Sequence, residues 1–390
     1  MYLVRPALQR YDWGTTTDLP DLLGFAADGR PWAEAWWGAH PAAPATAEVG
    51  GTEVALDELI AADPAGALGD EVARENDGTL PYLLKVLAIA KPLSIQVHPS
   101  AEVAEEGFWR EEAEGIDRDA PNRVYRDTRH KPEMVVALSP MAVLSGFRSS
   151  PEVARDLVGV GGEVASRLAD ALASEASEPL GIAAFLRAAL TDPESAAVVA
   201  AIARAGTKPG ASPNLAAAAA AARHFRGDPG VLVALAMNLV ELAPGEACYT
   251  PDGIVHSYQS GVGLEIMANS DNVIRAGLTS KHIDIPALLE VARTAPSAPH
   301  LPAERHDGDA LTYTSTAREF RLTTIADGRA SVDAGPRIVL CLEGETRVRS
   351  GVDEERLARG QAVFVPYSDG AATVRTTGRA AIATVPRPVG

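Results

Sequence analysis

Polar and apolar side chains alternate along residues 93–98, in a segment that lies between two prolines. Successive side chains of a β-strand point to opposite faces, so Ser94, Gln96 and His98 would share one face and the apolar residues between them the other. If the apolar face packs on a core, the polar face looks into a cavity, where three unpartnered polar groups would be unfavourable. The pattern therefore predicts that something binds this face, and the alternative is a surface strand with its polar side in water.

Short apolar segments elsewhere predict further strands around this one. A strand over residues 82–88 precedes it, and another begins at Met134, just after a proline whose missing backbone donor is tolerated at a strand start. From Gly245 to His256 the spacing Gly-x5-Pro-x-Gly-x2-His predicts two strands joined by a tight turn, with the histidine pointing inward. Two more predicted strands follow, at residues 264–267 and 273–278.

The pattern changes between Ser150 and about Leu242, where alanine dominates and apolar residues recur every three or four positions. This period is that of a helix with one buried face. Three helix starts are indicated by a polar residue next to a proline, at Asp192-Pro193, Pro213-Asn214 and Asp228-Pro229. Residues 150–242 are therefore predicted to form an insertion of several short helices.

The last eighty or so residues return to short β segments with closely spaced turns. Residues 360–366 repeat the glycine-to-proline spacing found after Gly245, but no histidine follows them. We therefore expect residues 310–390 to form a second copy of the β unit without a metal site. Residues 1–149 together with 243–292 would form the first unit, and the proline-rich residues 292–310 a linker.

Composition restricts the partners of the chain. It has 390 residues, 46% of them hydrophobic, and a formal net charge of −17, which argues against a general affinity for nucleic acids or anionic membranes. The first residues lack the apolar core of a secretory signal, and no apolar stretch is long enough to span a bilayer. The two cysteines make no disulfide framework, so we expect a cytoplasmic protein. We also expect the protein to be a monomer.

Four side chains are candidate metal ligands: Gln96, His98, Glu133 and His256. Two imidazoles, one carboxylate and one amide oxygen suit a divalent ion such as zinc, one per chain. A single carboxylate leaves the centre positive, so the ion remains a useful Lewis acid. Two histidines and one carboxylate would also suit non-haem iron. A fourth ligand at Gln96 argues against iron, because oxygen chemistry needs open coordination positions. Five other histidines lack such a pattern and are interpreted as surface or packing residues: His40, His224, His282, His300 and His306.

Basic residues lie close in sequence to the ligand segments: Lys85, Lys131, Arg275 and Lys281. Each alone could be a surface ion pair, but four of them beside metal-ligand segments in an acidic chain indicate an anionic substrate. An arginine fork matches a phosphate group, and a lysine supplies a point charge. Trp13 is a candidate wall of the pocket.

Several motifs of the chain resemble those of one known family. They are Tyr11-Asp12-Trp13-Gly14, the run from Pro92 to Pro99, His130-Lys131-Pro132-Glu133, the His256-Ser257-Tyr258 turn and the run from Asp271 to Thr279. In order and spacing they are similar to the motifs of type I mannose-6-phosphate isomerases, zinc enzymes of the cupin superfamily. The resemblance implies a mainly β fold of two cupin-type jelly rolls, one metal-binding and one degenerate and metal-free, with a helical domain inserted.

The same resemblance assigns roles to residues. Gln96, His98, Glu133 and His256 would bind zinc, and Arg275 would be the catalytic arginine. The substrate pocket would be lined by Ser94, Lys85, Lys131, Tyr258, Asp271, Lys281 and Trp13.

The implied reaction interconverts mannose 6-phosphate and fructose 6-phosphate by moving a proton between C2 and C1 through a cis-enediol. Glu265 lies in an apolar strand, where burial would raise its pKa toward the range useful for a base, so we nominate it as the proton carrier. Lys131 and His130 are rivals for this role. Two other functions are alternatives, a cupin iron oxygenase and a non-catalytic sugar-phosphate-binding protein.

Overall fold

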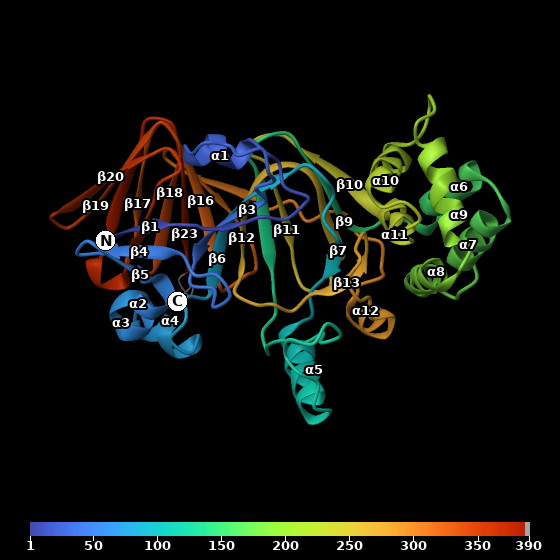
Figure 1. The fold of residues 1–390 in the computed structure, drawn as a ribbon, viewed down its shortest axis with the longest axis horizontal. Helices are drawn as coiled ribbons and strands as arrows, with labels where there is room; N and C mark the ends of the chain where they lie inside the picture. The colour runs from blue at the N-terminus through green and yellow to red at the C-terminus, as the bar shows by residue number, and fades with distance from the viewer. Residues whose placement is uncertain (387–390) are drawn as a thin grey trace.

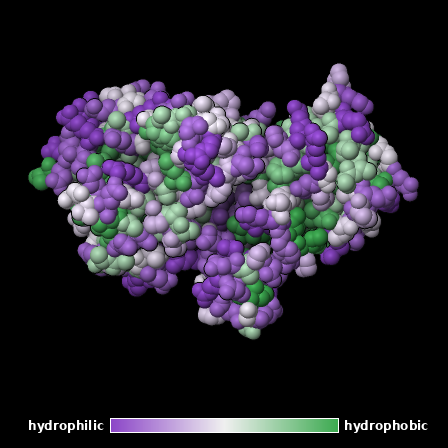
Figure 2. All heavy atoms as spheres, in the orientation of Figure 1, coloured by the Kyte–Doolittle hydropathy of each residue, from purple (hydrophilic) through white to green (hydrophobic). Residues whose placement is uncertain are grey.

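The computed structural model describes residues 1–386. Three groups of secondary-structure elements follow one another along its long axis (Figure 1). Strands from the C-terminal part lie at one end, a second β structure lies in the middle, and a group of helices lies at the other end. The face shown in Figure 2 is mainly hydrophilic and is hollowed near its middle, over the central strands. Within the described part of the chain, no helix combines the length and the apolar character needed to cross a membrane.

The central sheet has ten strands arranged around one long strand, β12, which pairs with β6, β7, β8 and β9. Because it contacts so many neighbours, β12 brings together segments that are far apart in sequence. The strands of this sheet are β2 (Ala7–Gln9), β3 (Glu34–Gly38), β6 (Tyr82–Ile89), β7 (Ile95–Val97), β8 (Glu133–Ala137), β9 (Met141–Phe147), β10 (Met237–Leu242), β11 (Ala247–Thr250), β12 (His256–Ala268) and β13 (Ile274–Gly277).

The predicted turn before His256 is present between β11 and β12. Gly253 has a φ of +78°, in the left-handed region that favours glycine. Its backbone N–H donates to the carbonyl of His98 at 2.9 Å. The turn is therefore fixed against the segment that carries the other histidine of the predicted metal site.

The C-terminal part is built from two further sheets. The nine-stranded sheet has the order β14-β15-β16-β23-β18-β21-β1-β4-β5, and the four-stranded sheet has the order β17-β22-β19-β20. Their strands are β1 (Tyr2–Arg5), β4 (Thr46–Val49), β5 (Thr52–Ala55), β14 (Glu304–Asp307), β15 (Ala310–Tyr313), β16 (Arg321–Ala326), β17 (Arg329–Val332), β18 (Arg337–Glu343), β19 (Glu345–Ser350), β20 (Asp353–Ala358), β21 (Ala362–Val365), β22 (Ala372–Thr376) and β23 (Arg379–Thr384).

The strand pairing differs from the predicted division in its details. The first strand, β1, pairs with β21 and with β4, so three N-terminal strands belong to the C-terminal sheet and not to the sheet of the metal site. The predicted linker at residues 292–310 contains strand β14. Long-range pairing of this kind leaves no local signal in sequence. The three-part division of the chain itself stays a prediction.

The predicted helical insertion is present as six helices that share one apolar core. They are α6 (Ser150–Val160), α7 (Glu163–Ala173), α8 (Glu178–Thr191), α9 (Ser195–Ala205), α10 (Pro213–His224) and α11 (Gly230–Ala236). Helix α10 begins at its predicted proline, and the Ser212 hydroxyl accepts from the Leu215 N–H at 3.1 Å. The insertion ends at Ala236, because Met237–Leu242 is strand β10 and pairs with β9. A short apolar run does not distinguish a helix from a strand, which explains the misplaced boundary.

The remaining helices lie outside this insertion. Helix α5 projects from the central sheet, on the side away from α1 (Figure 1). Its start is capped by Ser100, which accepts from the Val103 N–H at 3.4 Å. These helices are α1 (Asp18–Leu23), α2 (Leu56–Ala62), α3 (Pro64–Leu68), α4 (Asp70–Glu75), α5 (Ala101–Ala113) and α12 (Ile285–Val291), with a short 3-10 helix at Tyr367–Asp369.

Candidate metal centre

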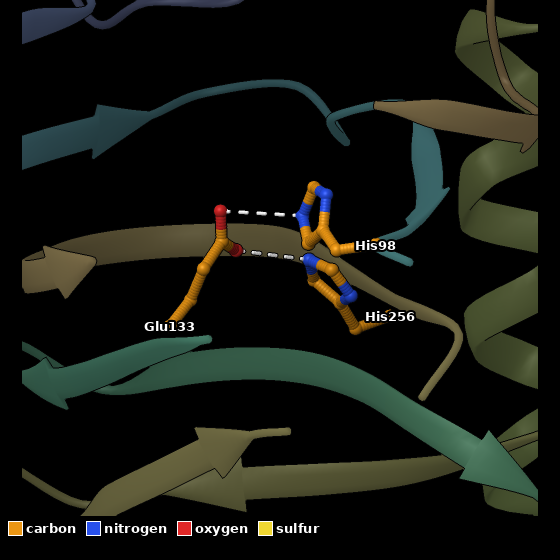
Figure 3. A group of neighbouring side chains, drawn as sticks. All are labelled: His98, Glu133 and His256. Atoms are coloured by element: carbon orange, nitrogen blue, oxygen red, sulfur yellow. Dashed lines mark hydrogen bonds and ion pairs between the residues drawn. The ribbon is translucent and has the colours of Figure 1, made fainter. Parts of the chain in front are cut away.

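Three of the four predicted ligands meet at one buried point (Figure 3). His98 follows β7, Glu133 begins β8 and His256 begins β12, and their ligand atoms all lie within 4.8 Å of one another. Glu133 Oε1 is 3.3 Å from His98 Nε2, and Glu133 Oε2 is 3.0 Å from His256 Nε2. The carboxylate therefore faces both imidazole rings.

The hydrogen-bond partner of Nδ1 in each ring shows which ring nitrogen is available to a metal ion. His98 Nδ1 lies 2.6 Å from the carbonyl oxygen of Asn272, and His256 Nδ1 lies 3.1 Å from that of Ile254. A carbonyl can only accept, so each Nδ1 carries a proton and donates it, and in the neutral ring Nε2 presents its lone pair. Both lone pairs then point at the Glu133 carboxylate, which is also an acceptor.

This arrangement of acceptors is unfavourable by itself and fits a cation. His98 Nε2 is buried and has no hydrogen-bond donor within the described residues. A divalent ion between the three side chains would satisfy all of the lone pairs at once. The donor set therefore fits zinc, and the backbone carbonyls orient the rings in the way that outer partners orient metal-binding histidines.

Electrostatics keep these side chains in the states that bind metal. Burial lowers the pKa of His98 to about 4, so its ring is uncharged at neutral pH. Burial works in the opposite direction on Glu133, but the positive charge of Lys131 opposes it, and the pKa of this carboxyl group lies well below its usual range. The site therefore offers a neutral imidazole at His98 and an ionised carboxylate at Glu133.

Gln96, the fourth predicted ligand, lies beside this point. It is the register neighbour of His256 across the β7–β12 pair, and neighbours in register share one face of a sheet. Its Nε2 donates to Ser94 Oγ at 2.9 Å, which leaves the amide oxygen free. We call the place where His98, Glu133 and His256 meet the metal point. As the alternation predicted, Ser94 and Gln96 both line a small cavity next to it. Coordination by Gln96 remains a prediction.

The floor of the cavity holds two lysines that are already paired with carboxylates. Lys85 Nζ is 3.2 Å from Glu265 Oε2, and Lys131 Nζ is 3.4 Å from Glu133 Oε1. Burial raises the pKa of Glu265 and the charge of Lys85 opposes that rise. The Tyr258 ring lines the same cavity, and its pKa is raised well above the usual value by burial and by Glu265.

Sequence reasoning missed Glu34, which also lines the cavity. Its carboxylate accepts from the Trp36 indole N–H and, with Glu265 and Glu133, overcomes the effect of burial and raises the pKa of Lys85. An acid within an apolar strand is the signal that singled out Glu265, and the same reasoning applies to Glu34, which lies between two alanines.

Other predicted residues lie farther from the metal point. Asp271 is exposed and lines a different cavity, and its Oδ1 is 3.4 Å from Nε2 of His40, which is a buried packing residue against Trp36. Trp13 stacks on Tyr11 and packs against an apolar cluster instead of lining the cavity.

His130 does not face the cavity, contrary to its suggested role as a rival proton carrier. Its Nδ1 lies 2.9 Å from Asp252 Oδ2 and its Nε2 lies 2.8 Å from Glu319 Oε1, so both ring nitrogens are engaged. Glu319 precedes β16, in the C-terminal part of the chain. His130 therefore connects that part to the turn before His256.

The geometry agrees with comparisons to known proteins. Residues 1–150 match the family model of the phosphomannose isomerase type I catalytic domain. The mannose-6-phosphate isomerase of Escherichia coli (strain K12) is 34% identical over 397 residues, covering 96% of this chain and 97% of that protein. The chain belongs to the type I mannose-6-phosphate isomerase family. The enzyme of Salmonella typhimurium is 35% identical, with the same coverage of both chains.

Solved structures of family members superpose over the whole molecule. A zinc-bound mannose 6-phosphate isomerase gives a TM-score of 0.91 at 32% identity and covers 99% of each chain. A structure of the Salmonella typhimurium enzyme with fructose 6-phosphate and zinc gives the same score and identity, covering 99% of this chain and 100% of that one. The predicted family and the predicted mainly β fold with a helical region are confirmed.

Proposed function

We propose that this protein interconverts mannose 6-phosphate and fructose 6-phosphate as a zinc-dependent aldose–ketose isomerase. The observation that carries the proposal is the buried point where two imidazole lone pairs and one carboxylate converge, beside a cavity lined by lysines and carboxylates. A mannose-6-phosphate isomerase matches 96% of this chain, and a solved structure of such an enzyme holds zinc and fructose 6-phosphate. These relatives do not favour an iron oxygenase or a non-catalytic binding protein.

His98, Glu133 and His256 would hold the ion, with Gln96 as the fourth ligand. When bound, zinc supplies a Lewis acid that polarises the oxygens of the sugar. The rest of the chemistry belongs to the chain. Moving a proton between C2 and C1 requires a base within reach of both carbons and a cation near the developing oxyanion.

Glu265 is our candidate for the proton carrier, and Lys131 is its rival. Glu265 is buried on the cavity floor, and burial moves its pKa toward neutrality, where a carboxyl group can both accept and return a proton. Arg275 would stabilise negative charge, since a guanidinium group stays protonated and cannot act as the base. Ser94, Lys85, Lys131, Tyr258, Asp271 and Lys281 would contact the substrate, whereas Trp13 would act only by supporting the cavity wall.

We also propose that the protein works as a monomer in the cytoplasm and has no nucleic-acid partner. The acidic chain argues against binding to nucleic acids. Its two cysteines, Cys248 and Cys341, are buried and unpaired, as is usual in a reducing compartment.

A coupled assay of fructose 6-phosphate conversion to mannose 6-phosphate tests the proposed function. The zinc-loaded protein should show isomerase activity that a chelator removes and added zinc restores, with about one zinc bound per chain. A fully zinc-loaded protein that does not interconvert the two sugars would overturn the proposal.

A further inference from the structure

The cations around the site fall into two groups. Lys85 and Lys131 are buried, and each already has a carboxylate partner, at 3.2 Å and 3.4 Å. Arg275 and Lys281 differ from them, because neither forms an ion pair with any acidic side chain within residues 1–386. The charge that remains available to an anion is therefore at Arg275 and Lys281.

A third cation, Arg126, lies on a segment that is hydrogen-bonded to Asn272, just before Arg275 in the sequence. Its backbone N–H donates to Asn272 Oδ1 at 2.7 Å, and Asn272 is only three residues before Arg275. Burial lowers the pKa of both Arg275 and Lys281, and the positive charge of Arg126 adds to the effect on each. The Arg126 side chain is exposed and makes no ion pair or hydrogen bond within the described part of the chain.

Asn272 holds the segment of Arg126 in a fixed place relative to the metal point. Its side-chain Nδ2 donates to the carbonyls of Asp127 and Arg129, each at 2.8 Å. Its own carbonyl accepts from Nδ1 of His98, at 2.6 Å. One buried residue therefore connects a metal ligand to the segment that carries Arg126.

Acidic side chains line the same cavity as Arg126, but within residues 1–386 none of them forms an ion pair with it. The Asp127 carboxylate accepts from the Ser270 hydroxyl at 2.9 Å and from the Asp271 backbone N–H at 2.8 Å. The Asp271 carboxylate faces His40, and the charge of Arg126 contributes only weakly to lowering its pKa. Three like charges without carboxylate partners repel one another, which is unfavourable until an anion binds between them.

The spacing of the strands fits a phosphorylated sugar. Arg275, Gln96 and His256 are successive register neighbours on β13, β7 and β12, so Arg275 begins two strand spacings, about 10 Å, from His256. This separation is comparable with the length of an open-chain hexose phosphate. Its carbonyl end would lie at the metal point and its phosphate at the unpaired cations.

We propose that Arg126 binds the phosphate group of the substrate, together with Arg275 and Lys281. This inference rests on the proposed function for the identity of the ligand, but the phosphate chemistry can be tested separately. Arg126 offers a planar fork of N–H donors that matches two phosphate oxygens, and Lys281 supplies a flexible point charge.

The test compares Arg126→Ala, Arg126→Gln and Arg126→Lys with wild type. Loss of one exposed charge-assisted contact should raise KM for fructose 6-phosphate about tenfold in the Ala and Gln variants. The Lys variant should lie between these and wild type, since it keeps the charge but loses the fork. The kcat and the zinc content should stay within about twofold of wild type.

Arg129→Ala is the matched control. Arg129 lies in the same segment, but its guanidinium group is 3.2 Å from Asp77 and so already has a carboxylate partner. Its KM should equal that of wild type. Equal KM values for the Arg126 and Arg129 variants would overturn the proposal, and so would a fall in kcat with KM unchanged.

Inorganic phosphate separates this inference from the proposed function. Its dissociation constant, measured by calorimetry on the zinc-loaded protein, should rise about tenfold in Arg126→Gln and stay unchanged in Arg129→Ala. This measurement needs no turnover. If wild type lacked isomerase activity, the proposed function would fail, and the phosphate titration would still support or overturn the role of Arg126.

Discussion

His98 and His256 approach one carboxylate with their unprotonated nitrogens, and at this scale single atoms determine the chemistry. A backbone carbonyl accepts the Nδ1 proton of each ring, so Nε2 is the ring nitrogen that faces the carboxylate. Glu133 supplies the only negative charge of the proposed ligand set, which leaves a bound divalent ion with net positive charge.

Replacing Glu133 by Gln should reduce zinc affinity strongly while keeping the shape of the side chain. We expect a loss larger than the ten- to hundredfold that is typical of outer partners, about 100-fold or more, because a direct anionic ligand is removed. A competitive chelator titration measures it. Glu241→Gln, an exposed position on β10, is the control and should bind zinc like wild type. Unchanged affinity in Glu133→Gln would remove Glu133 from the ligand set.

Replacing Glu265 by Gln should abolish proton exchange at C2, lowering turnover by about 10² to 10⁴. Zinc content should not change, since Glu265 lies on the cavity floor and is not part of the metal triad. The measurement is exchange of solvent hydrogen into the sugar. Retained exchange would transfer the role to Lys131, for which Lys131→Met is the matching variant.

The substitution Glu265→Gln also leaves Lys85 buried without its partner. Breaking a buried ion pair by removing one member costs about 3–5 kcal/mol, so Glu265→Gln should lower the free energy of unfolding. The double variant Lys85→Met, Glu265→Gln should recover much of that stability but not the exchange activity. Comparing the two variants therefore separates a loss of folding from a loss of chemistry.

At the scale of elements, the site is assembled by the pairing of β12 with its four neighbours. His98, Glu133 and His256 each lie at or just beyond a strand end, where the backbone is fixed by the sheet but the side chain can reach the others. The turn before β12 is held from a second side by His130, whose ring lies between Asp252 in this turn and Glu319 before β16. His130 therefore connects the metal-site turn to the C-terminal part.

The contact of His130 with Asp252 and Glu319 should make the free energy of unfolding depend on pH. Hydrogen bonds to Asp252 and Glu319 raise the pKa of His130 from 6.5 to about 10. Because the folded state holds the proton more tightly, the stabilisation is fully present below about pH 6.5 and is lost as pH rises through about 10. The difference in unfolding free energy between wild type and His130→Gln should therefore be largest at pH 6 and shrink toward pH 10.

His306→Gln is the control for this measurement, since His306 is exposed on β14. It should show no such trend. A difference for His130→Gln that stays constant from pH 6 to pH 10 would contradict the assignment of the raised pKa.

At the scale of the whole molecule, the C-terminal part and the central sheet share one apolar core. This core includes Leu84 and Ile266 from the central sheet and Ile338 and Phe364 from the nine-stranded sheet. The Tyr82 hydroxyl lies 3.1 Å from the carbonyl of Ala383, across the same boundary. The C-terminal part therefore supports the wall of the metal site, although it contributes none of the proposed ligands.

Phe364→Ala should destabilise the protein by about 3–5 kcal/mol, because this fully buried ring would leave a cavity in the shared core. Denaturant unfolding measures the loss. The kcat of the remaining folded protein should stay close to that of wild type, since the ring is far from the reacting groups in the fold. Val352→Ala, at a residue that is 96% exposed, should change stability by less than about 0.5 kcal/mol. A similar small effect at Phe364 would contradict the shared core.

The sequence by itself determined the elements and most of the chemistry near the site. The alternation before His98, the turn before His256 and the helix starts at Pro213 and Pro229 are local patterns, because they follow from side-chain period and backbone sterics. Ser94 and Gln96 line the cavity as their alternation predicted.

Only the tertiary structure decided which segments meet. The pairing of β1 with β21, the end of the helical insertion before Met237, the carbonyl of Asn272 at His98 and the unpaired state of Arg126 all arise between residues far apart in sequence. Such contacts depend on sheet order and register, which a sequence pattern restricts but does not specify. The sequence thus determined which groups could act, and the fold determined which of them face the cavity.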